Sequence, residues 1–287
     1  MSLRVETFFD EPTFTATHLL ADTASGRCAI VDPVLDYDPA AGRISHGAAD
    51  RLISRVRELG LTLEWILETH IHADHLTALA YLKSALGGRS AVGSAVTTVQ
   101  KTFAGLFNAG PDFTADGGQF DRLLADGESI ALGGLTVKAL STPGHTPACT
   151  TFLVDGSAFV GDTIFMPDFG TARCDFPGGD AATLYRSIRR ILGLPEATRL
   201  YLCHDYKVSG RDRFAWETTV AEERRGNIHV RDGIDEAAFV ALRRERDAGL
   251  PLPRLILPSV QVNMRAGQLP PADANGTHYL KIPLNRL

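Results

Sequence analysis

The sequence is poor in cysteine, lacks long apolar runs and has no excess of basic charge. Its four cysteines are widely spaced among 287 residues, which is typical of reduced thiols in a cytosolic protein rather than of a disulfide framework. No apolar run approaches the roughly 18 residues of a membrane span, and no export signal is visible at the start. The 29 Lys and Arg against 34 Asp and Glu residues give a net charge of -5, which argues against nucleic-acid binding. We therefore expect a cytoplasmic globular protein without a membrane or nucleic-acid partner.

Strand and helix patterns alternate through the first third of the chain. Apolar stretches predict strands at 15–20, 28–31 and 65–67. Apolar residues at helical spacing predict one helix over 52–59 and a second over 74–86. Such alternation indicates a mixed α/β protein.

Hairpins dominate the middle third. We predict strands at 128–132, 135–140, 150–154 and 158–160, joined in pairs by Gly133-Gly134 and Asp155-Gly156, which tolerate the positive φ angles of tight turns. A helix follows over 184–191 with Asp180 as its N-cap, and then a strand at 200–203. Strands in both halves with helices beside them predict two sheets packed face to face, covered by helices outside.

The composition changes near residue 210. From Asp212 onward the chain is mainly charged and helical in pattern, and from Pro251 it becomes a tail punctuated by proline. We therefore assign residues 1–230 to the main domain. Residues 231–287 form a helical and irregular extension, which we expect to pack on the same domain.

Five of the nine histidines lie in three polar clusters that directly follow predicted strands. The clusters are Thr69-His70-Ile71-His72-Ala73-Asp74-His75, Ser141-Thr142-Pro143-Gly144-His145 and Cys203-His204-Asp205-Tyr206. Asp162 follows a strand in the same way. Imidazole suits Zn, Fe, Cu and Ni, and a carboxylate can bridge two metals or complete a mixed ligand set. The sequence therefore predicts a metal site on loops held by a rigid sheet; the alternative is a hydrogen-bonded core that has lost its metal.

The order of these residues resembles the metallo-β-lactamase superfamily, to which the HxHxDH pattern is highly specific. The resemblance spans about residues 4–230. It implies an α/β fold, the four-layer αββα sandwich of two mixed sheets with outer helices, and makes residues 1–230 the catalytic domain. It does not name the reaction, because members hydrolyse lactams, thioesters, phosphodiesters and lactones, and some perform redox chemistry.

Longer segments are similar to one branch, the persulfide dioxygenases, also called sulfur dioxygenases. These segments are THIHADHLTALAYL, STPGHTPACTTF, GDTIFMPDFGTARCDF, LCHDYKVSGRDRFAWET and the late Val262-Asn263-Met264-Arg265. Enzymes of this branch oxidise glutathione persulfide with O2 to sulfite and glutathione at a mononuclear non-haem Fe(II). The resemblance thus implies one Fe(2+) per chain, with zinc as the alternative in a hydrolase or in mis-metallated protein.

Position by position, the resemblance implies that the metal ligands are His70, His145 and Asp162. Two histidines and one carboxylate are the ligand set of non-haem Fe(II) oxygenases. The other candidates would then orient these ligands rather than bind the metal: His72, Asp74, His75 and His204. Ligand counting alone leaves a dinuclear zinc site open.

The substrate contacts follow from the two carboxylates of glutathione, which call for cationic or amide donors. Candidates near the predicted site or in the tail are Arg173, Lys207, Arg211 and Arg265; the alternative for each is a solvated surface residue, and for Arg173 a structural pair with Asp175. We add Tyr206 to the catalytic residues His70, His145 and Asp162, as a hydrogen-bonding group near the metal. Its alternative is a tyrosine that covers the core with its hydroxyl in water.

Two other functions stay open on the sequence. A glyoxalase II-like thioester hydrolase with a dinuclear zinc site shares the fold, but the loop after Asp162 reads TARCDF rather than a glycine-rich GCGR-type sequence, and HDY stands where HEY is usual. A ligand-sensing protein with a structural metal would need only four closed ligands. For the assembly, we expect a homodimer formed through the tail helices.

Overall fold

Two six-stranded β-sheets form the centre of the protein, and the computed structural model describes residues 2–286. Across the first sheet lie, in order, β1 (Leu3–Asp10), β2 (Thr15–Asp22), β3 (Arg27–Val31), β6 (Thr62–Glu68), β8 (Arg89–Gly93) and β9 (Arg122–Leu124). Across the second lie β10 (Ser129–Leu132), β11 (Leu135–Ser141), β12 (Thr150–Val154), β13 (Ser157–Phe159), β14 (Arg199–Tyr201) and β15 (Glu217–Thr219). A small third sheet joins β5 (Arg43–Ser45), β4 (Val34–Asp38) and β7 (Leu76–Thr77).

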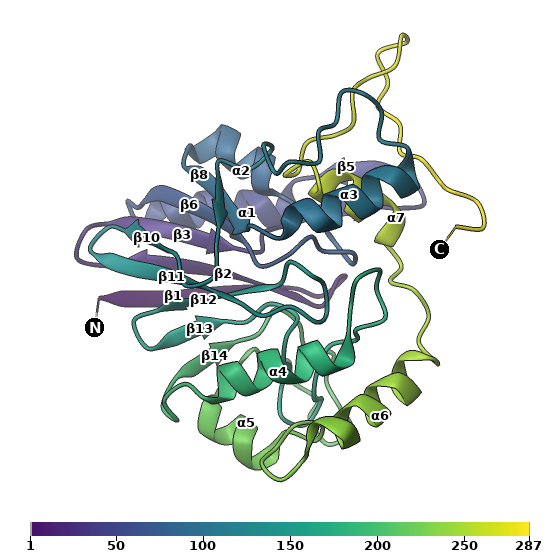
Figure 1. Ribbon diagram of the computed structural model, residues 1–287. Helices are drawn as coiled ribbons and strands as arrows, with labels where there is room; N and C mark the ends of the chain where they lie inside the picture. Colours follow the sequence, from purple (N-terminus) through teal and green to yellow (C-terminus); the bar gives the residue numbers. More distant parts are fainter. Residues whose placement is uncertain (1, 287) are drawn as a thin grey trace.

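Helices cover the outer faces of both sheets (Figure 1). They are α1 (Gly47–Glu58), α2 (Leu79–Leu86), α3 (Val96–Phe107), α4 (Ala181–Leu192), α5 (Val220–Gly226), α6 (Glu236–Asp247) and α7 (Ile256–Asn263). The first three lie outside the first sheet, and α4, α5 and α6 lie outside the second. Both sheets mix parallel and antiparallel pairs, so the predicted four-layer αββα sandwich is confirmed.

Three apolar layers hold the four structural layers together. Successive side chains of a strand point to opposite faces, so a strand between two layers must be apolar on both. Along β3, Ile30 faces the helices and Val31 faces the second sheet. Along β12, Phe152 faces the first sheet while Leu153 packs toward α4 and α6. Each such buried side chain contributes roughly 1.5–3 kcal/mol of hydrophobic free energy, which explains why these strands are almost continuously apolar.

The strands that precede the predicted ligands end at one edge of the sandwich. In the second sheet β11, β13 and β14 run in the same direction, because β12 pairs antiparallel with β11 and β13 while β14 pairs parallel with β13. The backbone N–H of Thr150 donates to the carbonyl of Thr69 at 2.9 Å, which joins the loop after β6 to the second sheet. The loops after all four strands therefore meet.

The predicted turns and cap are present. Leu132 pairs with Leu135 and Val154 with Ser157 across the two hairpin turns, and Asp155 has a φ of 45°, as this type of turn requires. Asp180 caps α4 by accepting a hydrogen bond from the Thr183 N–H at 2.8 Å. These local signals were sufficient because the short-range hydrogen bonds alone fix the turn.

Two predicted elements are corrected. The helix predicted over 74–86 begins only at Leu79, because Leu76 and Thr77 form strand β7 against β4 and the Thr77 N–H is bonded to a distant side chain. The strand predicted at 200–203 ends at Tyr201. The helix α3 had no predicted counterpart, although Val96, Val99 and Phe103 bury one face of it, since its β-branched and aromatic residues have weak helix propensity.

The C-terminal segment crosses the edge of the sandwich. Helix α6 packs on α4, and α7 packs beside β7 and α3 in the opposite helical layer. The connection between α6 and α7 runs along one side of the molecule from one outer layer to the other (Figure 1). Within residues 2–286, no helix has the length and apolar character needed to cross a membrane.

Candidate metal centre

The loop after β6 carries four of the potential ligands, and its first residue is held rigidly. The N–H and hydroxyl of Thr69 both donate to the Asp32 carboxylate, at 2.7 and 2.8 Å. Because its hydrogen is given to Asp32, the Thr69 hydroxyl accepts the hydrogen bond from His70 Nδ1 at 3.0 Å. This leaves the His70 Nε2 lone pair free for a metal.

Close backbone contacts place the loops of the second sheet. Gly161, next to Asp162, has φ +52°, and a Cβ there would lie 2.5 Å from Thr69 Oγ1, so a side chain at this position would push the two sheets apart. Gly144, next to His145, has φ +140° and packs so tightly on helix α4 that a Cβ would lie 2.3 Å from a backbone atom. Glycine is therefore required before both ligands.

The histidines of the second sheet are oriented by main-chain carbonyls. His145 Nδ1 donates to the Arg173 carbonyl at 2.7 Å, and His204 Nδ1 donates to the Phe14 carbonyl at 3.1 Å. A carbonyl can only accept, so in both residues the proton is on Nδ1 and the Nε2 lone pair faces the site. Metal-binding histidines are typically fixed in this way.

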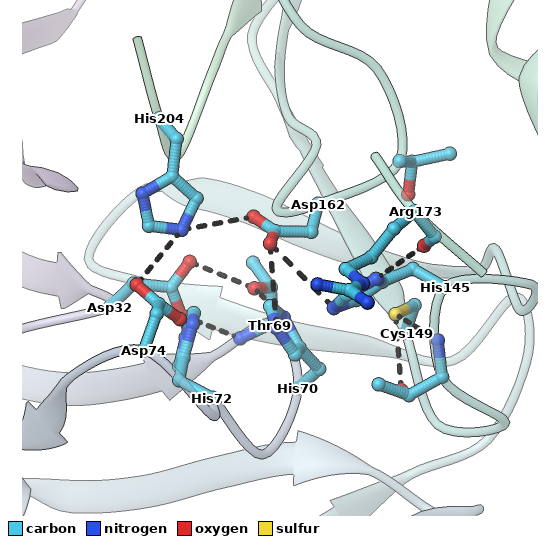
Figure 2. Close-up of polar contacts among 12 residues, drawn as sticks. Asp32, Thr69, His70, His72, Asp74, His145, Cys149, Asp162, Arg173 and His204 are labelled. Atoms are coloured by element: carbon cyan, nitrogen blue, oxygen red, sulfur yellow. Dashed lines mark hydrogen bonds and ion pairs between the residues drawn. The ribbon is translucent and has the colours of Figure 1, made fainter. Parts of the chain in front are cut away.

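His70, His145 and Asp162 form one compact set, which we call the three-ligand group. One ligand atom from each residue lies within 4.8 Å of the others. Asp162 Oδ2 is 3.6 Å from His145 Nε2 and 4.0 Å from His70 Nε2. Figure 2 shows Asp162 between His145 and His204. The structure thus brings together the three residues that the resemblance to persulfide dioxygenases assigns to one metal.

His72, Asp74, His75 and His204 form a second set, the four-ligand group, whose ligand atoms also lie within 4.8 Å of one another. Asp74 Oδ2 is 3.2 Å from His75 Nδ1 and 3.4 Å from His204 Nε2. The two groups touch, because Asp162 Oδ1 is 3.3 Å from His204 Nε2. The residues present therefore suffice for one metal or for two.

The buried polar atoms at this edge fit a metal. Several ligand atoms are shielded from water and have no hydrogen-bond partner: His70 Nε2, His72 Nδ1, His75 Nε2, His204 Nε2 and Asp162 Oδ1. An unpaired buried polar atom is costly, and five in one place are explained by an ion that accepts their lone pairs. These donor types suit Fe, Zn and related metals.

The electrostatic environment differs between neighbouring histidines. Burial, together with His72 and His145, holds the pKa of His70 well below its usual range, so this imidazole is neutral and able to bind a metal. Burial also disfavours a charge on His72, but Asp32 Oδ1, 3.0 Å from His72 Nε2, outweighs it and raises the pKa of His72 to about 10. His72 is thus paired with a carboxylate, whereas His70 is not.

A cavity of about 380 Å³ opens over the metal groups. Asp74, His145 and Asp162 lie at its inner end. Its walls are largely aromatic, formed by Phe14, Phe165, Phe169, Phe176 and Tyr206. Four arginines also line the cavity, namely Arg173, Arg243, Arg246 and Arg254. A site of this size with apolar walls and a few polar groups accommodates a small molecule.

The residues predicted to contact substrate separate into two sets. Tyr206 lines the cavity, with its ring centroid 5.9 Å from that of His204. Arg173 also lines it, but its guanidinium is bound to Asp175, with both hydrogen bonds at 2.6 Å. The other three predicted contacts do not line the cavity: Lys207, Arg211 and Arg265.

The structure gives each of these three another position. Arg211 is held by the carboxylates of Asp168 and Asp205. Lys207 Nζ lies 4.2 Å from the ring centre of Phe214. Arg265 donates to the Ala109 carbonyl. We therefore no longer assign substrate contacts to them, because their charged ends are occupied away from the cavity.

The sequence analysis missed residues on both sides of the centre. Asp32, which fixes Thr69 and His72, follows strand β3 and could have been found by the same strand-end rule as Asp162. Arg246 and Arg254 lie in the segment from α6 toward α7, and no pattern in the sequence distinguishes them from the other arginines. Their place at the cavity arises only from the path of the C-terminal segment.

Comparison with known proteins agrees with this geometry. Residues 11–204 match the family model of the Metallo-beta-lactamase superfamily. The chain belongs to this superfamily. A probable metallo-hydrolase of Burkholderia pseudomallei is 58% identical, covering 99% of this chain and all of its own length. Glyoxylase B2 of Dictyostelium discoideum is 48% identical, covering 99% of this chain and 98% of its own.

Relatives of the predicted branch are also found. The mitochondrial persulfide dioxygenase ETHE1 of Bos taurus is 34% identical over 92% of this chain and 89% of its own. The crystal structure of ETHE1 from Myxococcus xanthus superimposes with a TM-score of 0.73 at 29% identity, covering 92% of this chain and all of that one. The protein is thus an enzyme of the metallo-β-lactamase superfamily, related to both hydrolases and dioxygenases.

Proposed function

We propose that this metallo-β-lactamase superfamily protein is a persulfide dioxygenase with one Fe(II), and that its substrate is a small anionic persulfide such as glutathione persulfide. The observation that carries the proposal is the three-ligand group: two neutral histidines and one carboxylate from three loops, of which His145 and Asp162 line the inner end of the cavity. This is the facial ligand set of non-haem Fe(II) oxygenases, which leaves coordination positions open. The similarity to ETHE1 supports it.

The reaction consumes one persulfide, one O2 and one water, and yields sulfite, the free thiol and two protons. Bound Fe(II) would supply the redox chemistry that activates O2. The protein contributes orientation: Thr69 and the Arg173 carbonyl fix His70 and His145, and the aromatic walls exclude water from the inner end. A persulfide sulfur held there lies next to the ligand group.

Charge along the cavity supports an anionic substrate. The carboxylates in the lining, Asp74 and Asp162, are both at the metal end. Toward the C-terminal segment, Arg246 and Arg254 are exposed and have no carboxylate partner among residues 2–286. A thiol whose carboxylates lie several bonds away from its sulfur could place the sulfur near the metal ligands and the carboxylates near the two arginines. Glutathione is such a molecule.

A second candidate is a thioester hydrolase with two zinc ions. The four-ligand group favours it, because its atoms lie as close together as those of the three-ligand group. The similarity to glyoxylase B2 of Dictyostelium discoideum supports it too.

Two assays on the same protein separate the candidates. Protein loaded anaerobically with Fe(II) and desalted is tested for O2 consumption with glutathione persulfide, and zinc-loaded protein for cleavage of a glutathione thioester. The proposal requires about one iron per chain, O2 uptake that depends on iron, and sulfite as product. Two metals per chain with thioester cleavage and no O2 uptake would overturn it in favour of the hydrolase.

A further inference from the structure

We infer that Asn263, the last residue of helix α7, is a positioning residue of the metal centre: its side-chain amide holds the loop between His72 and Thr77 in the shape that presents Asp74 and His75. The inference concerns metal binding and rests on the metal-dependent function proposed above, whichever of the two reactions the metal serves. Asn263 lies 186 residues after Thr77 in the chain, outside the predicted catalytic domain.

Both amide hydrogens and the oxygen of the Asn263 side chain are bonded to this loop. Its Nδ2 donates to the carbonyls of His72 and His75, at 2.9 and 2.8 Å. Its Oδ1 accepts from the Thr77 N–H at 2.8 Å. The residue is only 2% exposed, so water cannot replace these bonds. A buried amide with two donor bonds and one acceptor bond has a single orientation.

The two bonded carbonyls stand on either side of Asp74. The segment from His72 to His75 is irregular, so no helix or strand fixes its shape. Asn263 therefore supplies what regular secondary structure would supply elsewhere. Asp74 lies 3.4 Å from His204, and His204 lies 3.3 Å from Asp162 of the three-ligand group. A loop that opened would therefore disturb the residues that orient the proposed ligands.

Asn263 is itself held in place by the first helical layer. The Gln100 side chain on α3 donates to the carbonyl of Met264 at 2.9 Å, next to Asn263. Helix α7 also packs on β7, which directly follows the loop. The C-terminal segment is therefore fixed to both the metal loop and α3, beside which α7 lies in Figure 1.

The same helix offers a matched control. Gln261 is also a buried amide, 3% exposed. It makes three hydrogen bonds to main-chain atoms too, donating to the carbonyls of Leu257 and Lys281 and accepting from the Lys281 N–H. These bonds fasten the tail and not the metal loop. Replacing Gln261 thus removes the same number and kind of bonds without touching the ligands.

The test compares Asn263→Ala with Gln261→Ala in the full chain, without substrate. Co(II) affinity is measured by competition with a chelator, the visible spectrum of the Co(II) form reports ligand geometry, and thermal unfolding of metal-free protein reports stability. Both variants should lower the unfolding temperature. Only Asn263→Ala should weaken Co(II) binding, by roughly 10-fold or more, as loss of groups that orient ligands does, and change the spectrum.

Two results would overturn the inference: Co(II) affinity of Asn263→Ala within twofold of the parent, or an equal loss in Gln261→Ala, which would indicate general destabilisation. Should Asn263→Ala not fold, Asn263→Ser is judged by the same criteria. None of these measurements uses persulfide or O2. The role of Asn263 can therefore be judged even if the dioxygenase proposal fails, and the dioxygenase proposal can be judged even if the role of Asn263 is refuted.

Discussion

The three-ligand group and the four-ligand group contain the same residue types but differ in the partners of their histidines. In the first, uncharged partners fix the histidines: the Thr69 hydroxyl orients His70, and the Arg173 carbonyl orients His145. In the second, carboxylates lie beside the histidines: Asp32 faces His72, and Asp74 faces His75 and His204, although the Phe14 carbonyl fixes the orientation of His204. The contrast is sharpest between His70 and His72: Asp32 Oδ1 lies 3.0 Å from His72 Nε2, whereas Asp162 Oδ2 lies 4.0 Å from His70 Nε2.

The difference between these two residues favours metal binding by His70 over metal binding by His72. A histidine that is bound to a carboxylate and has a raised pKa, as His72 has, must lose a proton before it binds a metal at neutral pH. His70 need not lose a proton, because its pKa lies well below the usual range and its imidazole is already neutral. The comparison thus predicts that the two groups respond differently to substitution.

The largest effect is expected from removing a ligand of the three-ligand group. His145→Ala should abolish retention of iron after desalting, a loss of affinity greater than the roughly 10–100-fold typical of groups that only orient ligands, and with it O2 uptake. His75→Ala should retain about one iron per chain. Iron content and O2 consumption are measured on both. Equal loss of iron in His75→Ala would mean that the two groups act as one dinuclear site.

The next largest effect is expected on the free energy of unfolding of the metal-free protein. Asp32→Asn breaks a buried ion pair with His72, which typically costs about 3–5 kcal/mol because the remaining charge is left unpaired. Asp162→Asn should cost far less, because Asp162 accepts no protein hydrogen bond at Oδ1. Urea unfolding of chelator-treated proteins measures both free energies. Similar losses would show that the three-ligand group is also held by its own charges.

The same pair predicts a pH dependence. The pKa of His72 is about 10 in the folded protein, against 6.5 as its ordinary value. A histidine whose pKa is raised by folding contributes its full stabilisation at pH values below its unfolded-state pKa. This stabilisation is lost as the pH rises through the folded-state pKa. The metal-free parent should therefore lose stability between pH 6.5 and 10 more steeply than Asp32→Asn. Parallel curves for the two proteins would contradict the pairing.

Substrate binding should change without any change in metal binding when the arginines at the cavity are altered. Arg246→Gln combined with Arg254→Gln should raise KM for glutathione persulfide about 10-fold, equivalent to about 1.4 kcal/mol of binding, with kcat and iron content unchanged. Arg244→Gln is the control, because Arg244 is an exposed arginine on the same helix that lines a different cavity. An unchanged KM in the double variant would remove the argument for an anionic substrate.

The sequence was a good guide where short-range patterns decide the structure. The hairpin turns, the Asp180 cap and the clustering of histidines and aspartates after strand ends needed only neighbouring residues. It failed where distant hydrogen bonds decide: Leu76 and Thr77 have a helical pattern but form a strand, because β4 and Asn263 bind their backbone. It also failed for Arg211, whose charge is satisfied by Asp168 and Asp205, since no local pattern reveals which arginine has a partner.

The smallest effect is expected at Tyr206, which lies beside the four-ligand group. Its ring packs against Phe169, with ring centroids 5.0 Å apart, and faces His204, so Tyr206→Phe keeps the cavity wall and removes only a hydroxyl. A neutral hydrogen bond contributes about 1 kcal/mol, so kcat should fall by about fivefold at most and KM should stay unchanged. Steady-state O2 consumption measures both. A fall of kcat by more than about 100-fold would indicate that the hydroxyl takes part in a proton transfer. The reaction would then involve the side of the cavity that lies near His204.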